Sequence, residues 1–400
     1  MNLDRLRTTA GLDVAGKRVL VRADLNVPMR AGEVGDATRL ERLVPGLKDL
    51  ARRGARVILI SHLGRPKGVD AQLSLRPVAA ALGALIGAPV AFAGDCIGEV
   101  AASTTAALRP GQIAVLENLR FHRGETENDP AFAGELAALA EIFINDAFSA
   151  AHRAHASTDA VTRCLPSYAG PLLMQEIAAL RSVLETPRRP VAAVIGGAKV
   201  SSKIPLLTNL VAKVDTLIVG GGMANTFLLA EGVGVGTSLA EPDFVDTARA
   251  IRAAAERQGC ELVLPEDAVV APKLAPGVAV RVVAVRATPA DAMILDLGPA
   301  TVDRLCALLA GCHTLIWNGP LGAFEVAPFG AGTFALARQA ARLTGTGRLL
   351  SVAGGGDTVA ALNAAGVTSA FSYVSTAGGA FLEWLEGRNL PGIAALAATE

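Results

Sequence analysis

Short runs of apolar residues alternate with longer amphipathic stretches along most of the chain. In the first half the runs are 18–22, 56–60, 113–116 and 141–144. After the first run, the apolar positions show the i, i+3, i+4, i+7 spacing of a helix: Leu40, Leu43, Val44, Leu47 and Leu50. Continuous apolar strands separated by helices predict a parallel sheet with both faces covered.

The same alternation begins again after residue 190. The later runs are 191–195, 216–219, 261–264, 314–317, 349–352 and 371–374. An α/β fold with two doubly wound, Rossmann-like parallel-sheet domains joined by a hinge helix is therefore predicted. We expect domains at 1–170 and 188–388 around a helix at 171–187, with the tail 389–400 as a candidate to pack back on the first domain.

Composition narrows the class of protein. Of the 400 residues, 51% are hydrophobic and 18% are charged, which is typical of a folded globular protein. The net charge of zero argues against a nucleic-acid binder. The chain has no apolar run long enough to span a membrane, and its start lacks the apolar core of a secretory signal. Five cysteines without a CxxC pair indicate reduced thiols, so we expect a cytoplasmic protein.

Polar segments follow each strand of the first half at the end where α/β sheets bind ligands. Residues 1–185 hold 18 Arg and only 3 Lys, an excess that codon bias explains in large part. The placement of individual arginines carries more information, because Arg binds phosphate and carboxylate in a bidentate manner. Arg22 or Asp24, Arg65, Arg120 and Arg153 are expected to converge, with Arg39 and His62 nearby. Such a set fits a small, highly anionic ligand.

The segments that follow the strands of the second half are rich in glycine, where those of the first half are rich in arginine. The stretch 191–203 has a buried strand, a Gly196-Gly197 turn, and a predicted helix on which Lys199 and Lys203 would share a face. Glycine turns that enter helices present backbone N–H groups to phosphate. The second half therefore reads as a nucleotide site, in which Asp357 is either a helix N-cap or a ligand of nucleotide-bound Mg²⁺.

Less specific interpretations exist for each signal. A single Arg after a strand often forms only a surface ion pair, and His62 alone often caps or packs. His122, His152 and His155 have no carboxylate or cysteine spacing that supports a metal.

Nine segments together resemble those of the phosphoglycerate kinase family, in order and nearly end to end. They are 21–28 (VRADLNVP), 61–66 (SHLGRP), 116–121 (LENLRF), 145–148 with 151–155 (NDAF, AHRAH), 196–200 (GGAKV), 220–224 (GGGMA), 317–320 (WNGP), 355–358 (GGDT) and 374–376 (VST). The resemblance implies reversible phosphoryl transfer from 1,3-bisphosphoglycerate to ADP in glycolysis or gluconeogenesis, in line, with Mg²⁺ and hinge closure, by a monomer.

The resemblance also implies roles for residues in the matched segments. Arg39 and Lys199 would touch the transferring phosphoryl group, and Asp357 would lie near the metal. The phosphoglycerate would be held by Asp24, Leu25, Asn26, Arg39, His62, Leu63, Gly64, Arg65, Arg120 and Arg153. The nucleotide would be held by Lys203, Glu325, Gly355, Gly356, Asp357 and Thr358.

The sequence departs from the pattern of this family at one position, and two other functions are alternatives to phosphoryl transfer. Ala377 stands where the family usually has a glycine, and a positive φ there would strain the loop by roughly 1–2 kcal/mol. A nicotinamide-dependent dehydrogenase would need a GxGxxG turn after a strand, which the sequence lacks. A non-catalytic paralogue that only binds nucleotide is disfavoured by the presence of Arg39, Lys199, Lys203 and Asp357.

Overall fold

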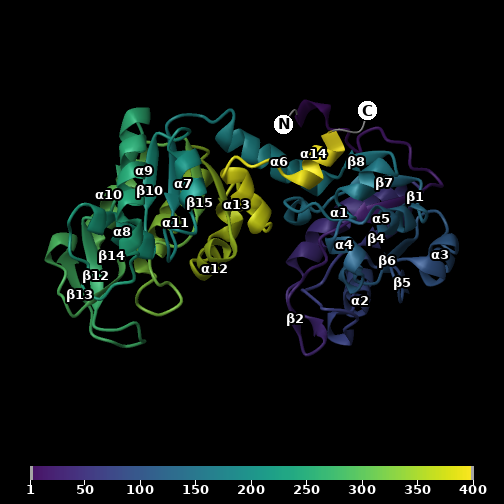
Figure 1. Cartoon of the computed structure of the whole chain (residues 1–400), viewed down its shortest axis with the longest axis horizontal. Helices are drawn as coiled ribbons and strands as arrows, with labels where there is room; N and C mark the ends of the chain where they lie inside the picture. Colours follow the sequence, from purple (N-terminus) through teal and green to yellow (C-terminus); the bar gives the residue numbers. More distant parts are fainter. Residues whose placement is uncertain (1–2, 398–400) are drawn as a thin grey trace. The chain divides into compact units, whose positions relative to one another are not determined.

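Two compact units make up the chain. The computed structural model describes residues 3–397, so residues 1–2 of the expected first domain and 398–400 of the expected tail lie outside the described part. One unit comprises Met1–Ile177 with Asn389–Glu400, and the other comprises Ala178–Arg388. Helix α6 (Pro171–Leu184) begins in the first unit and ends in the second (Figure 1). Its role as a hinge stays a prediction.

The first unit is built on a parallel sheet with the strand order β5-β6-β4-β1-β7-β8. Its strands are β1 (Arg18–Arg22), β4 (Arg56–Ile60), β5 (Val90–Ala93), β6 (Ile113–Leu116), β7 (Ile142–Asn145) and β8 (Ser167–Ala169). Its helices are α1 (Thr38–Arg52), α2 (Arg76–Ile86), α3 (Gly98–Ala106), α4 (Arg123–Thr126), α5 (Pro130–Ala137) and α14 (Pro391–Ala397), and β2 (Met29–Arg30) and β3 (Glu33–Val34) form a small hairpin.

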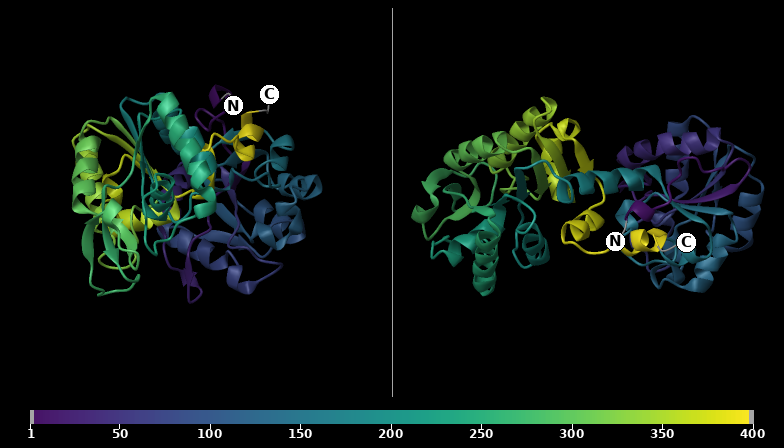
Figure 2. Two further views of the ribbon diagram at one scale, coloured as in Figure 1. Left: turned by 60° about the vertical axis from the view of Figure 1, so that its left-hand side comes forward. Right: turned by 90° about the horizontal axis from the view of Figure 1, so that it is seen from above.

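One face of this sheet carries the main core of the unit. Val19 and Val21 of β1 belong to one buried cluster with Leu43 and Leu47 of α1. Their alternation along β1 places both valines on the same face of the sheet, while helices cover both faces (Figure 2). Burial of each large aliphatic side chain contributes about 1.5–3 kcal/mol to the stability of the sheet. The sheet in turn positions the loops that follow its strands.

The second unit repeats this architecture and adds a smaller sheet. Its parallel sheet has the order β11-β10-β9-β15-β16-β17, and an antiparallel sheet has the order β13-β12-β14. The strands are β9 (Val191–Ile195), β10 (Thr216–Val219), β11 (Glu261–Val263), β12 (Asp267–Ala271), β13 (Arg281–Ala284), β14 (Met293–Leu297), β15 (Thr314–Asn318), β16 (Leu350–Gly354) and β17 (Tyr373–Ser375). The helices are α7 (Ile204–Leu210), α8 (Gly221–Ala230), α9 (Val245–Gln258), α10 (Pro299–Ala310), α11 (Ala331–Gly345), α12 (Gly356–Ala364) and α13 (Gly379–Leu385). The two predicted parallel α/β domains are thus confirmed.

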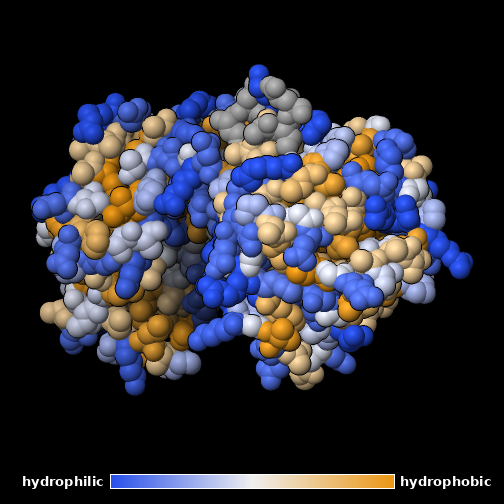
Figure 3. Space-filling model, turned by 45° about the vertical axis from the view of Figure 1, so that its right-hand side comes forward, coloured by the Kyte–Doolittle hydropathy of each residue, from blue (hydrophilic) through white to orange (hydrophobic). Residues whose placement is uncertain are grey.

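The surface of the described chain mixes hydrophobic and hydrophilic residues, and its last helix packs on the first unit. On the face shown in Figure 3, hydrophobic residues are interspersed with hydrophilic ones. No helix within residues 3–397 is long and apolar enough to cross a membrane. Helix α14 contacts β8, and its Gly392 N–H donates to the Ala151 carbonyl at 2.9 Å.

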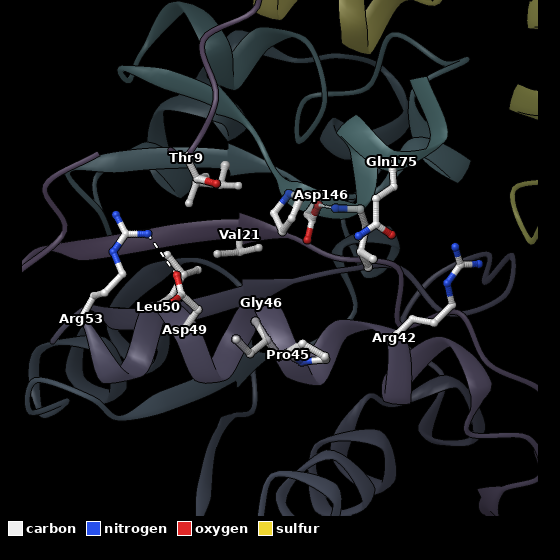
Figure 4. A pocket seen from close by; sticks show the side chains of 14 residues that line it. Thr9, Val21, Arg42, Pro45, Gly46, Asp49, Leu50, Arg53, Asp146 and Gln175 are labelled. Carbon is white, nitrogen blue, oxygen red and sulfur yellow. Dashed lines mark hydrogen bonds and ion pairs between the residues drawn. The ribbon is translucent and has the colours of Figure 1, made fainter. Parts of the chain in front are cut away.

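Asp146, directly after β7, caps the first turn of α6. Its Oδ1 accepts the N–H groups of Leu172 at 2.7 Å and Leu173 at 3.1 Å. Gly170 makes this possible, because a Cβ there would lie 2.3 Å from the same oxygen. Asp146 also lines a cavity of about 430 Å³ between α1 and the start of α6, shown in Figure 4. Burial raises the pKa of Asp146 to about 7.

This raised pKa predicts a pH-dependent stability. Between about pH 4, where an unfolded Asp titrates, and pH 7, the folded chain keeps a proton that the unfolded chain has lost. The contribution of Asp146 to stability is therefore complete below about pH 4 and falls as the pH rises toward 7. In Asp146→Asn the amide does not titrate and its oxygen can still accept both N–H groups. The melting temperature of the wild type should drop more over this range than that of Asp146→Asn.

Asp146→Ala supplies the contrast. It removes the cap, so it should be less stable than Asp146→Asn by about 0.5–2 kcal/mol at every pH in this range. A wild-type and Asp146→Asn pair whose melting temperatures differ by the same amount at both ends of the range would contradict the assignment of a raised pKa.

Candidate functional site

Four polar segments meet at one edge of the first sheet. The strands that precede them, β6, β4, β1 and β7, are consecutive neighbours in the sheet and are all parallel. The carboxyl ends of parallel strands lie at the same edge, so the segments that begin at 23, 61, 117 and 146 are adjacent. The predicted convergence of these loops is what the strand order produces.

Hydrogen bonds join the polar residues at this edge into one network. Arg39, from the first turn of α1, lies 3.2 Å from the Asp24 carboxylate and donates to the Asn26 carbonyl at 2.6 Å. The side-chain oxygen of Asn26 accepts the Gly64 N–H at 2.9 Å. Arg120 donates to the Gly64 carbonyl at 2.6 Å. Five of the predicted phosphoglycerate residues are therefore connected directly.

Arg22 fixes the protonation state of His62. Its guanidinium is buried and lies 2.9 Å from His62 Nδ1, and it also donates to Ser157 Oγ at 3.0 Å. A guanidinium only donates, so Nδ1 must accept and the imidazole proton resides on Nε2. Burial and then the charges of Arg22 and Arg120 hold the pKa of His62 well below its usual range. His62 is thus a neutral residue with an N–H available as a donor.

Positive charge accumulates at this edge of the sheet. Burial, and then the charges of Arg22, Arg153 and Arg65, lower the pKa of Arg120 to about 10, although Glu125 opposes this. Three neighbouring arginines thus add to the effect of burial on Arg120. Arg65 and Arg153 are exposed. Mutual repulsion of this kind is relieved when an anion binds, so the cluster is suited to a small polyanion.

Leu25 and Leu63 contribute differently from their polar neighbours. Both side chains are buried, and both backbone N–H groups are already bonded inside the protein. The Leu25 N–H donates to Ser61 Oγ at 2.9 Å, and the Leu63 N–H donates to Asn118 Oδ1 at 3.2 Å. These two leucines therefore stabilise the loops, and their backbone N–H groups are already bonded within the protein.

The loop after β9 corrects one prediction from the sequence. Residues 196–203 are not helical, and α7 begins only at Ile204, with Lys203 as its N-cap at φ −130°. Lys199 and Lys203 consequently do not share a helix face. The cause is a tertiary contact, because Glu241 accepts hydrogen bonds from the Ser201 N–H at 2.9 Å and the Ser201 hydroxyl at 2.6 Å and holds the loop open. Lys199 is exposed on this loop.

A close backbone crossing holds the loops of β9 and β15 together. A Cβ on Gly196 would lie 1.8 Å from the Pro320 carbonyl oxygen, and Gly319 adopts φ +99° beside it. Only glycine allows two backbones to approach in this way. Just before this crossing, Asn318 of β15 accepts a hydrogen bond from Lys203 Nζ.

The loop after β16 joins the same group of residues. Asn318 donates to the Gly354 carbonyl at 2.7 Å, and the Gly319 N–H donates to Thr358 Oγ1 at 2.7 Å. Gly355, with φ +102°, is the N-cap of α12, and Asp357 is exposed in the first turn of this helix. Burial lowers the pKa of Lys203 to about 8, while the charge of Asp357 opposes this shift. The structure thus brings Lys203, Asp357 and Thr358 together.

A cavity of about 480 Å³ opens beside these loops. Glu325 and Asp357 line it, together with glycines of the turns at 197 and 221–222 and apolar residues that the sequence reasoning missed. Among the missed residues are Leu239, Met293, Leu295, Pro320 and Leu321. Several of them come from β14, part of the antiparallel sheet that the sequence pattern did not predict. A volume of this size and a mostly apolar lining suit one nucleotide-sized ligand.

Ala377 causes no strain. Among the described residues, the non-glycine positions with positive φ are Ala31 and Asn128. In this turn the positive φ, +44°, occurs at Gly378. The expected strain at Ala377 is thus absent, because the positive φ falls on the glycine that follows it.

Arginines beyond the strands of one α/β sheet, and glycine turns beside a cavity on the other, are an arrangement expected of a two-domain kinase. A family model for phosphoglycerate kinase matches residues 9–388. The phosphoglycerate kinase of Rhodospirillum centenum is 58% identical over 393 residues, which cover 98% of this chain and 99% of that protein. The phosphoglycerate kinase of Azorhizobium caulinodans is 59% identical over 390 residues and 98% of each chain.

Solved structures agree with these sequence relatives. The phosphoglycerate kinase structure from Coxiella burnetii has a TM-score of 0.91 and 42% identity over 98% of each chain. That from Pyrococcus horikoshii OT3 has a TM-score of 0.84 and 27% identity over 98% of each chain. The chain belongs to the phosphoglycerate kinase family, and it is accordingly a transferase and a kinase of glycolysis.

The backbone crossing at Gly196 gives a testable prediction. Gly196→Ala should push the β9 and β15 loops apart at a cost of about 1–3 kcal/mol, the usual range for overpacking, and should weaken MgADP binding. Gly345→Ala is the matched control, because Gly345, at the end of α11, does not line the cavity, its Cβ would meet nothing within 4 Å and its φ is not positive. Calorimetric MgADP titrations of both variants test this prediction. Equal affinities in the two variants would contradict it.

Proposed function

We propose that the chain transfers a phosphoryl group reversibly from 1,3-bisphosphoglycerate to ADP, giving 3-phosphoglycerate and ATP. The observation that carries this proposal is the division of chemistry between the units. One sheet ends in interacting arginines, and the other ends in glycine turns around a cavity. A dehydrogenase is not favoured by the family match, and a non-catalytic paralogue would have no need of both sites.

The phosphoglycerate site is proposed at the arginine-rich edge of the first unit. Arg65, Arg120 and Arg153 would bind its phosphate and carboxylate, and the neutral His62 would donate from Nε2. Asp24 and Asn26 would accept from the substrate hydroxyl while they hold Arg39 in place. Leu25, Leu63 and Gly64 would shape the loops around the ligand.

The nucleotide site is proposed at the cavity of the second unit. Lys203 and the helix start at Gly355, Gly356 and Thr358 would bind phosphates, and Glu325 would accept from the ribose. Asp357 fits a nucleotide-bound Mg²⁺, because it offers an exposed carboxylate on the cavity wall and this ion prefers oxygen ligands. When bound, Mg²⁺ neutralises charge on the phosphates.

The reaction needs positioning and charge stabilisation more than proton transfer. The attacking group is an ionised phosphate oxygen of ADP, and the leaving group is a carboxylate that needs no proton. No general base is required. Arg39 and Lys199 are proposed to stabilise the charge of the transferring phosphoryl group. The in-line transfer and hinge closure that the family resemblance implies stay predictions, as do a monomeric state, a cytoplasmic location and the absence of nucleic-acid or membrane partners.

A coupled assay of ATP formation tests the proposed reaction. The purified chain, supplied with 1,3-bisphosphoglycerate and MgADP, should form ATP and 3-phosphoglycerate in equal amounts. Omission of Mg²⁺ should abolish most of the rate. A chain that binds MgADP but forms no ATP would support the non-catalytic alternative instead.

Arg65→Ala and Arg120→Ala test the anion site. Each should weaken 3-phosphoglycerate binding by about 1.5–3 kcal/mol, the value of a hydrogen bond to a charged group, and should leave MgADP affinity nearly unchanged. Arg123→Ala is the control, because the Arg123 side chain is 90% exposed and pairs with Glu127. The proposal fails if both dissociation constants for 3-phosphoglycerate match that of the control.

Lys203→Ala and Lys199→Ala should separate binding from turnover. Lys203 holds the nucleotide in ground and transition states alike, so its loss should chiefly raise the KM for nucleotide. Lys199 meets the phosphoryl group mainly during transfer, so its loss should lower kcat by roughly 10²–10³ with little change in MgADP affinity. Steady-state kinetics with separate binding measurements distinguish the two. Loss of nucleotide affinity with a normal kcat in Lys199→Ala would show that the roles are assigned wrongly.

Because the pKa of Lys203 is lowered, MgADP affinity should depend on pH. Nucleotide phosphates bind the protonated amine, so MgADP affinity should fall as the pH rises through about 8. Lys203→Ala has no amine to titrate at this position and should lack this decline. The same decline in the variant would assign it to another group.

A further inference from the structure

Two neighbouring loops of the first unit bring together a thiol, an imidazole and a carboxylate. Asp95 and Cys96 lie between β5 and α3, and His122 lies between β6 and α4. Strands β5 and β6 are paired in parallel, so the loops that follow them start at the same edge of the sheet. This partnership of His122 is not visible in the sequence, because 25 residues separate it from Cys96.

The three side chains are close enough to share one ion. The sulfur of Cys96 and one ligand atom from each of Asp95 and His122 all lie within 4.8 Å of one another. His122 Nε2 is 2.7 Å from Asp95 Oδ1. Stacking on Phe132, with 5.4 Å between ring centroids, restricts the His122 ring. Within residues 3–397 this is the one group of three or more His, Cys, Asp and Glu side chains with such spacing.

We propose that Asp95, Cys96 and His122 form a binding site for Zn²⁺ or a similar borderline-soft divalent ion, with water as the fourth ligand. Thiolate and imidazole favour Zn²⁺ over Mg²⁺, which prefers oxygen. Bonds of about 2.0–2.3 Å would place tetrahedral ligand atoms roughly 3.3–3.8 Å apart. The 2.7 Å distance between His122 Nε2 and Asp95 Oδ1 must therefore lengthen by at least about 0.6 Å. Any distance from the Cys96 sulfur that exceeds this range must shorten.

Proton movements on binding are simple. The Cys96 thiol releases its proton to solvent and bonds as a thiolate. The His122 Nε2 proton, now donated to Asp95, is replaced by the metal, and Nδ1 carries the imidazole proton instead. One proton is released for each ion bound, and no oxidation or reduction takes place.

Access and charge both favour a cation at this place. Cys96 is fully buried, whereas the side chains of His122 and Asp95 are 31% and 42% exposed. An ion can therefore enter from the side of the histidine and the carboxylate. Asp95, and beyond it Glu125 and Glu117, place negative charge around the thiol. The site is separate from Asp357, which belongs to the other unit.

Cobalt titration of the full chain tests the proposal. After chelator treatment under reducing conditions, Co²⁺ should bind one equivalent and produce the near-ultraviolet band of thiolate-to-cobalt charge transfer with tetrahedral d–d bands. Zn²⁺ should displace Co²⁺ and remove these bands, and excess Mg²⁺ should not. Cys96→Ala should lack the charge-transfer band. Asp95→Asn and His122→Gln should weaken Co²⁺ binding by more than the roughly 10–100-fold that loss of an outer-shell partner costs.

Cys164→Ala is the matched control, because Cys164 is an exposed free thiol and should not contribute. Asp95→Asn and His122→Gln alter partly exposed side chains, so they keep the test valid if Cys96→Ala, in the core, fails to fold. The proposal is overturned if the wild type shows no charge-transfer band, if Cys96→Ala keeps the band, or if Cys164→Ala loses it.

Discussion

Parallel strand pairing is the constraint on which both halves of the molecule depend. Every pair in the two larger sheets is parallel, so each sheet has one edge at which all strands end. The loops that carry polar residues or glycines follow those ends. Buried aliphatic side chains on β1 and β9 fix the register of the strands, and the register in turn fixes the loops. The chemistry of each unit is thus set by what its sequence places just beyond an apolar strand.

We propose that the two units bind their anions in different ways. In the first, charged side chains would bind the ligand, and hydrogen bonds hold several of these side chains in place. Arg22 sets the tautomer of His62, and Asp24 with Asn26 positions Arg39. In the second, backbone N–H groups would make most of the contacts to the ligand. Glycines at 196 and 319 allow the close backbone crossing that brings these loops together. A small acyl phosphate needs directed charge, whereas a nucleotide needs a cavity and the N–H groups of helix starts.

The sequence was sufficient wherever the signal was local. The apolar runs at 18–22, 56–60 and 191–195 coincide with β1, β4 and β9. It failed where tertiary contacts decide the outcome. Strands β12 to β14 have no apolar pattern strong enough to predict them, and β14 lines the cavity of the second unit. The helix expected at Lys199 is absent because Glu241, about 40 residues away, captures Ser201. Leu25 and Leu63 lie in the matched motifs, yet their N–H groups serve the loops.

Hydrogen exchange on the full chain would test most directly the claim that each unit holds a different ligand. Amide exchange would be followed with 3-phosphoglycerate alone and with MgADP alone. We expect 3-phosphoglycerate to slow exchange in peptides that cover 23–26, 62–65 and 118–120. MgADP should slow exchange in peptides that cover 196–203, 319–322 and 355–358. Protection of the first set of peptides by MgADP alone, or of the second set by 3-phosphoglycerate alone, would contradict the account.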